Sequence, residues 1–178
     1  MLVVGATERE LAHVHGLEMV VCGIGPVEAA LQTALALAAH KPDAVLHIGI
    51  AGARGIAAPA LVLGSESVYC DVVDPSSLLK RIERIQPDPE LFARVHAALP
   101  EAYVLPIATA GKVGAGAEYE VEAMEGFGVL RACALAGVPA VELRAVSNAP
   151  DEADRGTWSF EDAFAALGDA VTRVLAAG

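Results

Sequence analysis

Short runs of hydrophobic residues, each ended by glycine or proline, alternate along the chain with longer stretches rich in alanine and leucine. The short runs predict buried β-strands at 1–5, 16–25, 42–53, 102–111 and 138–146. The longer stretches predict helices at 26–40, 88–99, 119–137 and 159–178. Because strands alternate with helices, we expect one α/β domain over 1–178, a three-layer αβα sandwich around a central mixed sheet.

The ends of several elements are marked by capping and turn residues. Pro26 opens the helix predicted at 26–40, and Asp88 stands at the start of the helix predicted at 88–99. Gly137 ends the helix predicted at 119–137. Ser159, with Asp162 three residues later, predicts the cap of the last helix. The run at 61–73 indicates either two strands or one bent strand with a bulge at Gly64. The polar, proline-rich segment 74–90 is expected to be a surface excursion.

Composition narrows the class of partner. Hydrophobic residues make up 54% of the chain and aromatic residues 4%, and the formal net charge is -11. Without a basic stripe, nucleic acids and anionic membranes are poor partners.

The three cysteines, Cys22, Cys70 and Cys133, form no CxxC pair and favour a reducing compartment with free thiols. The segment 1–10 does not resemble a secretory leader, and 19–39 is too interrupted to span a bilayer. We therefore expect a soluble cytoplasmic protein.

The residues that could bind or convert a ligand lie where the predicted strands end. In α/β folds ligands bind outside the carboxyl ends of the strands, and four strands end there in "GATERE", "CGIGP", "HIGIAGA" and "RAVSNAP". Glu8 and Glu10 could supply a general base, or they could begin a solvated helix. Gly49 and Gly52 allow the backbone to approach a flat ligand. "CGIGPVEAA" lacks the pattern of a dinucleotide-binding turn.

The segment "EAMEGFG" places acids beside glycines. On the predicted helix Glu122 and Glu125 share a face. Glu125 is either a carboxylate that holds both hydroxyls of a ribose or an exposed residue at a helix start. His13 and His15 have no third ligand at a recognisable spacing, so no metal site is expected. His47, inside an apolar strand, is expected to be a core histidine with satisfied hydrogen bonds.

In chain order, the quoted segments resemble the purine and uridine phosphorylase/nucleosidase superfamily. "EAMEGFGVLRACALAGVPAVELRAVSN" is the specific block, and "GATERE", "CGIGPVEAALQTA" and "IGIAGA" support it. Within the superfamily the segments are most similar to futalosine hydrolases, with methylthioadenosine/S-adenosylhomocysteine nucleosidases as near relatives. The resemblance implies a phosphorylase/hydrolase-like fold, a purine nucleoside substrate, no cofactor, and a homodimer or higher homo-oligomer.

The resemblance also implies roles for individual residues. Glu125 would bind the ribose hydroxyls with Met124 beneath the sugar, and Glu10 would deprotonate the attacking water. The residues implied to serve the base and the ribose are Ile50, Ala51, Gly52, Ser147 and Asn148. Arg144 is expected to form a structural ion pair. Phe127, Tyr119 and Trp158 are candidates to stack on the base, and we favour Trp158 because it follows the Asn148 loop.

Asn148 stands where adenine-specific relatives have an aspartate. An amide can donate to one acceptor of a 6-oxopurine and accept from a protonated N7, which favours hypoxanthine as the leaving base. His47 and Ile50 replace the Arg and Ser of phosphorylase-like phosphate sites, so water is the expected nucleophile. The predicted function is hydrolysis of futalosine to release hypoxanthine in menaquinone biosynthesis. The alternatives are an adenine-releasing nucleosidase and a catalytically silent nucleoside-binding protein.

Overall fold

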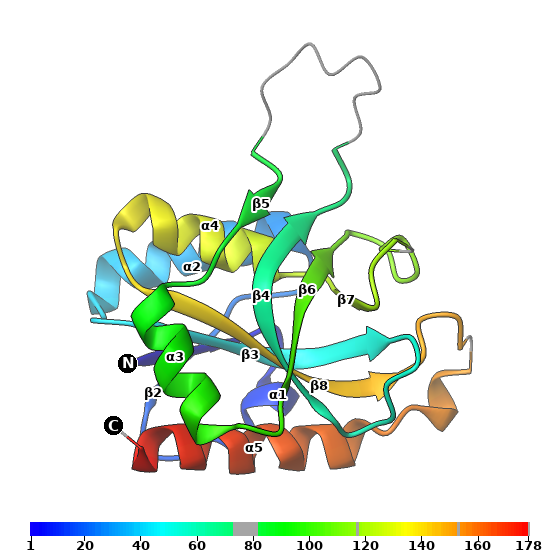
Figure 1. The fold of residues 1–178 in the computed structure, drawn as a ribbon. Coiled ribbons are helices and arrows are strands. Elements are labelled where there is room, and N and C mark those ends of the chain that lie inside the picture. Colours follow the sequence, from blue (N-terminus) through cyan, green and yellow to red (C-terminus); the bar gives the residue numbers. More distant parts are fainter. Residues whose placement is uncertain (73–81, 117, 153, 178) are drawn as a thin grey trace.

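The computed structural model describes residues 1–72, 82–116, 118–152 and 154–177. Part of the excursion expected at 74–90 therefore lies outside the described residues. Among the described residues, each helix is too short or too polar to cross a bilayer. The elements, shown in Figure 1, are β1 (Leu2–Gly5), α1 (Glu8–Leu11), β2 (Glu18–Val21), α2 (Pro26–His40), β3 (Val45–Ala53), β4 (Leu61–Tyr69), β5 (Arg84–Ile85), α3 (Pro89–Ala98), β6 (Tyr103–Thr109), β7 (Val121–Ala123), α4 (Gly126–Ala136), β8 (Ala140–Asn148), η1 (Arg155–Thr157) and α5 (Phe160–Ala176).

The strands of the described residues form one mixed sheet that closes partly on itself. Its order is β2-β1-β3-β7-β6-β4-β5, and β8 pairs with both β3 and β4. β8 therefore completes a ring with β3, β7, β6 and β4, while β1 and β2 extend the sheet. β1, β2, β3 and β8 run parallel. Their carboxyl ends lie at one edge, and this edge receives the four segments that the sequence singled out.

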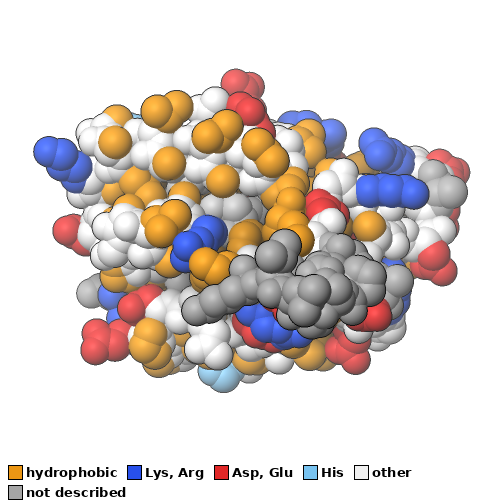
Figure 2. All heavy atoms as spheres, turned by 90° about the horizontal axis from the view of Figure 1, so that it is seen from above, with side chains coloured by type: hydrophobic (Ala, Val, Ile, Leu, Met, Phe, Trp, Pro, Cys, Tyr) orange, Lys and Arg blue, Asp and Glu red, His pale blue; other side chains and the backbone are white. Residues whose placement is uncertain are grey.

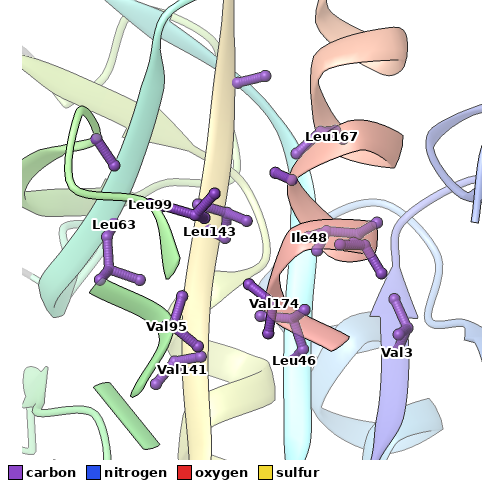
Figure 3. Packing of buried hydrophobic residues seen from close by; sticks show 14 of the residues in the cluster. Val3, Leu46, Ile48, Leu63, Val95, Leu99, Val141, Leu143, Leu167 and Val174 are labelled. Carbon is purple, nitrogen blue, oxygen red and sulfur yellow. The ribbon is translucent and has the colours of Figure 1, made fainter. Parts of the chain in front are cut away.

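Helices cover both faces of the sheet, which confirms the predicted α/β class with a mixed sheet (Figure 1). Alternate residues of β1 show the principle: Leu2 and Val4 pack toward α2 and α4, and Val3 packs toward α5. On the α3 and α5 side, Figure 3 shows sheet residues such as Leu46, Ile48 and Leu143 packed with Leu167 and Val174. Side chains that alternate between two buried layers explain the nearly continuous apolar strands.

Several predicted boundaries are confirmed. α2 spans Pro26–His40, as the sequence indicated. Asp88 caps α3 and accepts a hydrogen bond from the Leu91 amide at 2.8 Å, an interaction typically worth about 1 kcal/mol. The described part of the 61–73 run, residues 61–72, contains the single strand β4, and its register with β6 shifts next to Gly64. α4 ends at Gly137, which adopts the left-handed conformation.

The prediction of one helix over 119–137 was wrong at its start. Residues 121–123 form β7, which pairs with β3 and β6, and α4 begins only at Gly126. The inference that Glu122 and Glu125 share a helical face therefore fails. α4 starts at glycines because it packs very closely there. A Cβ at Gly126 would overlap the Glu142 carboxylate, and one at Gly128 would overlap the Pro26 carbonyl oxygen.

Two further details differ from the sequence-based expectation. Ser159 precedes α5 but its side chain makes no capping hydrogen bond; its amide instead donates to the Ser147 carbonyl at 2.8 Å. Within the 74–90 segment, Arg84 and Ile85 form β5, a short strand that pairs with β4. Both features depend on contacts with distant parts of the chain.

Candidate functional site

The short helix α1 begins at the exposed Glu8, as one alternative held, but Glu10 within it is buried at the carboxyl end of β1. It is 4% exposed. Its Oε2 accepts from the amide and hydroxyl of Thr7, and Thr7 in turn caps α1, which forms a capping box. Its Oε1 accepts from the Ile50 amide at 3.0 Å. The capping box and the contact with β3 fix the carboxylate in one orientation at the edge of the sheet.

Arg144, on β8, is the centre of a buried hydrogen-bonded network. Its side chain is fully buried, and its Nε donates to Glu142 Oε1 at 2.8 Å. One terminal nitrogen lies 3.3 Å from Glu125 Oε2, and the other lies 2.6 Å from His47 Nε2. Burial alone would lower the pKa of Arg144, but the carboxylates of Glu142, Glu125 and Glu10 raise it above the ordinary value. The guanidinium is therefore charged and surrounded by acceptors, which confirms the expected ion pair.

The two sides of this network extend to β1 and β4. Ser67 donates to the second oxygen of Glu142. His47 is fully buried, and its Nδ1 lies 2.9 Å from the Val4 carbonyl. Burial and the nearby Arg144 lower the pKa of His47 well below its ordinary value. His47 is thus a neutral core histidine with satisfied hydrogen bonds, as predicted.

Gly49 lets Arg144 and the catalytic candidate Glu10 approach one another across β3. A Cβ at this position would overlap the Arg144 guanidinium and lie 2.7 Å from Glu10 Oε1. The glycine therefore leaves room for Arg144 and Glu10 on the same face of the strand. The sequence-based expectation was that Gly49 and Gly52 let the backbone approach a flat ligand; at Gly49 the space is instead occupied by side chains of the protein itself.

Glu125 stands just before α4 and is 4% exposed. Its Oε1 accepts from the Gly25 amide at 3.1 Å, in the turn between β2 and α2. Burial raises the pKa of Glu125 above the ordinary value, although Arg144 and the Gly25 amide act in the opposite direction. Met124, the preceding residue, is half-buried. Glu125 and Glu10 thus both lie against the network of Arg144.

Ser147 and Asn148 end β8 beside Ala51 and Gly52 of β3, which were predicted to line the base and the ribose. The Ser147 hydroxyl donates to Asn148 Oδ1 at 2.8 Å, and Asn148 Nδ2 donates to the Ala149 carbonyl at 2.9 Å. Asn148 pairs in register with Gly52, and a Cβ on Gly52 would lie 3.2 Å from Asn148 Nδ2. The Ser147 hydroxyl also lies 3.4 Å from the Ala51 carbonyl.

The aromatic candidates lie in different places. Trp158 is half-buried, next to Ser159, whose amide binds Ser147. Its ring packs against Phe160 with centroids 5.4 Å apart. Phe127 is 9% exposed and stacks on Tyr69 at 5.1 Å, so one face of its ring is covered by the protein. Tyr119 accepts a hydrogen bond from Arg84 through its hydroxyl.

Three residues that support the site were not assigned to it from the sequence. Glu142 binds Arg144, Ser67 donates to Glu142, and the Gly25 amide donates to Glu125. One signal was available: Glu142 and Arg144 are two residues apart in an otherwise apolar strand, so they point to the same face. Within the described residues, no group of three or more His, Cys, Asp or Glu side chains is arranged to hold a metal ion.

Comparisons with known proteins identify the family of the chain. Residues 7–177 match the family model described as "Phosphorylase superfamily". The chain is 34% identical to the futalosine hydrolase of Streptomyces coelicolor over 89% of this chain and 78% of that protein. A shorter stretch of 64 residues, 34% of this chain and 27% of the relative, is 42% identical to the 5'-methylthioadenosine/S-adenosylhomocysteine nucleosidase of Chromohalobacter salexigens.

The fold is also that of a solved structure. A mutant of futalosine hydrolase from Helicobacter pylori superposes with a TM-score of 0.87, with 19% identity, over 98% of this chain and 97% of that one. At this identity the likeness shows the fold alone, whereas the family assignment depends on the matches at the level of sequence. The chain belongs to the phosphorylase superfamily and, within it, to the futalosine hydrolases, which are hydrolases of N-glycosidic bonds.

Proposed function

We propose that this protein hydrolyses the N-glycosidic bond of futalosine and releases hypoxanthine. The orientation of the Asn148 amide is the observation that supports this most directly. Since the Ala149 carbonyl can only accept, Nδ2 must face it, and the Ser147 hydroxyl donates to Oδ1. One N–H of Nδ2 and a lone pair of Oδ1 are then left for a base. This pair matches N7 and O6 of a 6-oxopurine, as argued from the sequence.

The hydrogen bonds of the two buried carboxylates fit the proposed roles. A carboxylate offers about four acceptor sites. Glu10 accepts three hydrogen bonds from Thr7 and Ile50, so one site is left to take a proton from water. Glu125 is bound by the Gly25 amide and by Arg144, so about two sites are left for the 2′- and 3′-hydroxyls of ribose.

The reaction then proceeds as a displacement at the anomeric carbon. As the bond to the base breaks, the ribosyl group gains oxocarbenium character. Glu10 deprotonates the attacking water, Glu125 fixes the sugar, and Asn148 stabilises the negative charge of the departing purine. Ile50, Ala51, Gly52 and Met124 would line the ribose and base, and Trp158 is our candidate to stack on the base.

Water is favoured over phosphate as the nucleophile. The guanidinium of Arg144 is fully buried and directed at protein acceptors, so it is not free to hold an external anion. Ile50 places an apolar side chain where a phosphate site would need a hydroxyl, which would leave the anion poorly solvated. Hydrolysis is consistent with both observations.

The decisive experiment is chromatography of the bases released in phosphate-free buffer from futalosine, inosine and methylthioadenosine. Hypoxanthine from futalosine is the expected product. Adenine from methylthioadenosine would instead support the second candidate, to which the 64-residue match with the nucleosidase points. Binding without release of any base would indicate a silent nucleoside-binding protein. A Glu10→Gln variant separates catalysis from silent binding, because it should abolish turnover by an enzyme and leave the binding of nucleosides unchanged.

We further propose that the chain forms a homodimer through α2 and α4. Val27, Leu31 and Leu35 recur every four residues on α2 and are 58–67% exposed, and Leu135 of α4 is 71% exposed. A groove of about 510 Å³ lies between the helices, lined by residues such as Ala34 and Ala136. Figure 2 shows hydrophobic side chains gathered over this side of the molecule. In a chain of net charge -11, an uncharged stripe fits a second copy of itself, because charged surfaces would repel.

The remaining parts of the proposal concern the setting of the reaction. Release of hypoxanthine from futalosine would place the protein in menaquinone biosynthesis in the cytoplasm. The three thiols are free, which is consistent with a reducing compartment. Comparison of menaquinone content between cells with and without the gene would test the assignment to this pathway.

A further inference from the structure

Glu122 binds a loop on the base side of the site, yet the mechanism proposed above makes no use of it. Its side chain is 7% exposed and lies on β7, where it is paired in register with Gly52 of β3. Gly52 is also the register partner of Asn148 on β8. Glu122 and Asn148 therefore flank the same glycine from its two neighbouring strands.

The carboxylate of Glu122 is held by backbone amides of the loop 111–116 and by one arginine. Oε1 accepts from the Gly114 amide, and Oε2 accepts from the Gly116 amide at 3.1 Å. The Arg54 guanidinium lies 3.5 Å from Oε2. Hydrogen bonds to an ionised acceptor are about twice as strong as those between neutral groups. Glu122 therefore fixes the backbone of the loop at two points.

The glycines of the loop are required by this arrangement. Gly114 has φ +82°, a conformation that side chains disfavour. A Cβ on Gly116 would lie 2.7 Å from the Cβ of Ala108 and 3.1 Å from Glu122 Oε2. The loop thus wraps closely around the carboxylate, and its conformation depends on the carboxylate being there.

Arg54 connects the carboxylate to the segment just before β7. Its guanidinium donates to the Tyr119 carbonyl at 2.8 Å, and its amide donates to the Glu120 carbonyl at 2.8 Å. Its side chain is 34% exposed, so it approaches the carboxylate from the surface. Arg54 and Glu122 together link the loop, β7 and the end of β3.

The loop lies against the turn that follows Asn148. A Cβ on Gly114 would stand 3.7 Å from the Pro150 carbonyl oxygen, and one on Gly52 would stand 3.1 Å from Pro150 Cγ. A shift of the loop would therefore be felt at Pro150, two residues from the amide of Asn148. Glu10 and Glu125 are held by other partners, Ile50 and Gly25, and do not depend on the loop.

We propose that Glu122 is a positioning residue that holds the 111–116 loop as one wall of the purine-base pocket. This rests on the proposed function, since that function assigns the base side of the site to Asn148. Glu122 acts on binding of the base and not on cleavage of the bond. Its loss should therefore weaken affinity for the base and leave the chemical step nearly intact.

The test compares Glu122→Gln with Glu120→Gln, a neighbouring exposed carboxylate, in steady-state kinetics with futalosine and in calorimetric titration with hypoxanthine. The glutamine keeps the volume but loses the charge and one acceptor. We expect the KM and the hypoxanthine Kd of Glu122→Gln to rise together by about tenfold, with kcat within about threefold of wild type. Glu120→Gln should match wild type. Arg54→Met, which removes the more exposed partner, should shift KM in the same direction by a smaller factor.

A purely structural role gives a different result. If kcat falls while KM and Kd remain at wild-type values, the variant contains only less folded enzyme and the proposal is overturned. Failure of the proposed function is distinguishable, because the wild-type protein would then release adenine or no base at all. If it releases adenine, the same comparison of KM and Kd is made with methylthioadenosine and adenine; if it releases no base, the Kd for hypoxanthine alone decides the role of Glu122.

Discussion

The Nε2 atom of His47 lies 2.6 Å from a terminal nitrogen of Arg144. A guanidinium can only donate, so Nε2 must be the acceptor and the proton of the imidazole must be on Nδ1, which faces the Val4 carbonyl. A second proton on His47 would be placed against a positive charge inside the core. The network around Arg144 therefore requires a neutral histidine.

This requirement predicts acid sensitivity of the fold. The pKa of His47 is lowered in the folded state by burial and by Arg144, so below about pH 6.5 the unfolded chain binds more protons at this residue than the folded one. Its stabilising contribution is present above that pH and is lost as the pH falls. The free energy of unfolding should thus decline by up to about 1.4 kcal/mol per pH unit on this account. His47→Gln, which keeps a donor and an acceptor, should show a shallower decline in denaturant titrations.

The matched control for this prediction is His15→Gln, because His15 is exposed. It should retain the pH dependence of the wild type. Equal slopes in the wild type and His47→Gln would contradict the assigned protonation state.

The raised pKa of Glu125 predicts an acidic limit to activity. Glu125 must be ionised to accept the ribose hydroxyls, and burial raises its pKa above the ordinary value. kcat/KM should therefore increase as the pH rises through this raised pKa. Glu142→Gln removes a nearby negative charge and should move this rise in kcat/KM to lower pH. Arg144→Met removes a nearby positive charge and should move the rise to higher pH. Profiles of kcat/KM against pH measure both, and shifts in the same direction would refute the electrostatic account.

Asn148 is expected to control which base leaves. Asn148→Asp replaces the donor that faces the departing purine, so release of hypoxanthine from futalosine should fall by on the order of 100-fold. The protonated acid could donate to N7 of adenine, so methylthioadenosine should become a better substrate relative to futalosine. Chromatography of both products gives the ratio. Full activity on futalosine in this variant would show that the amide does not select the base.

The closeness of α4 to β8 predicts a stability effect at Gly126. Because an added Cβ would overlap the Glu142 carboxylate, Gly126→Ala should destabilise the fold by roughly 1–3 kcal/mol. The control is Ala134→Ser at an exposed position of the same helix. Thermal denaturation of the three proteins measures the difference, and an unchanged midpoint for Gly126→Ala would mean that Glu142 has room to move.

The apolar stripe on α2 predicts the oligomeric state. The double substitution Leu31→Glu and Leu35→Glu places like charges in the proposed interface and should convert a dimer to a monomer in analytical ultracentrifugation. Ala97→Glu, at an exposed position of α3, should leave the dimer intact. A wild-type protein that sediments as a monomer at high concentration would rule the interface out.

Local pattern was sufficient to predict most elements and their order. Leu2, Val3 and Val4 show why: a run with apolar residues at every position fits a strand buried on both faces, and helices are needed to cover it. Parallel strands bring their carboxyl ends together, so the grouping of "GATERE", "HIGIAGA" and "RAVSNAP" also followed from the sequence. The capping box of Thr7 and Glu10 is a local signal as well, and it could have been found from the spacing.

The sequence by itself determined the α/β order, the buried faces, and the acid and amide at the strand ends, because these depend on neighbours within a few residues. Tertiary structure alone decided that 121–123 is a strand, since a three-residue strand exists only through its partners β3 and β6. It also decided the partners of Arg144 and Glu122. Hydrogen bonds such as those between Gly25 and Glu125 join residues 100 positions apart, and no local periodicity encodes such a distance.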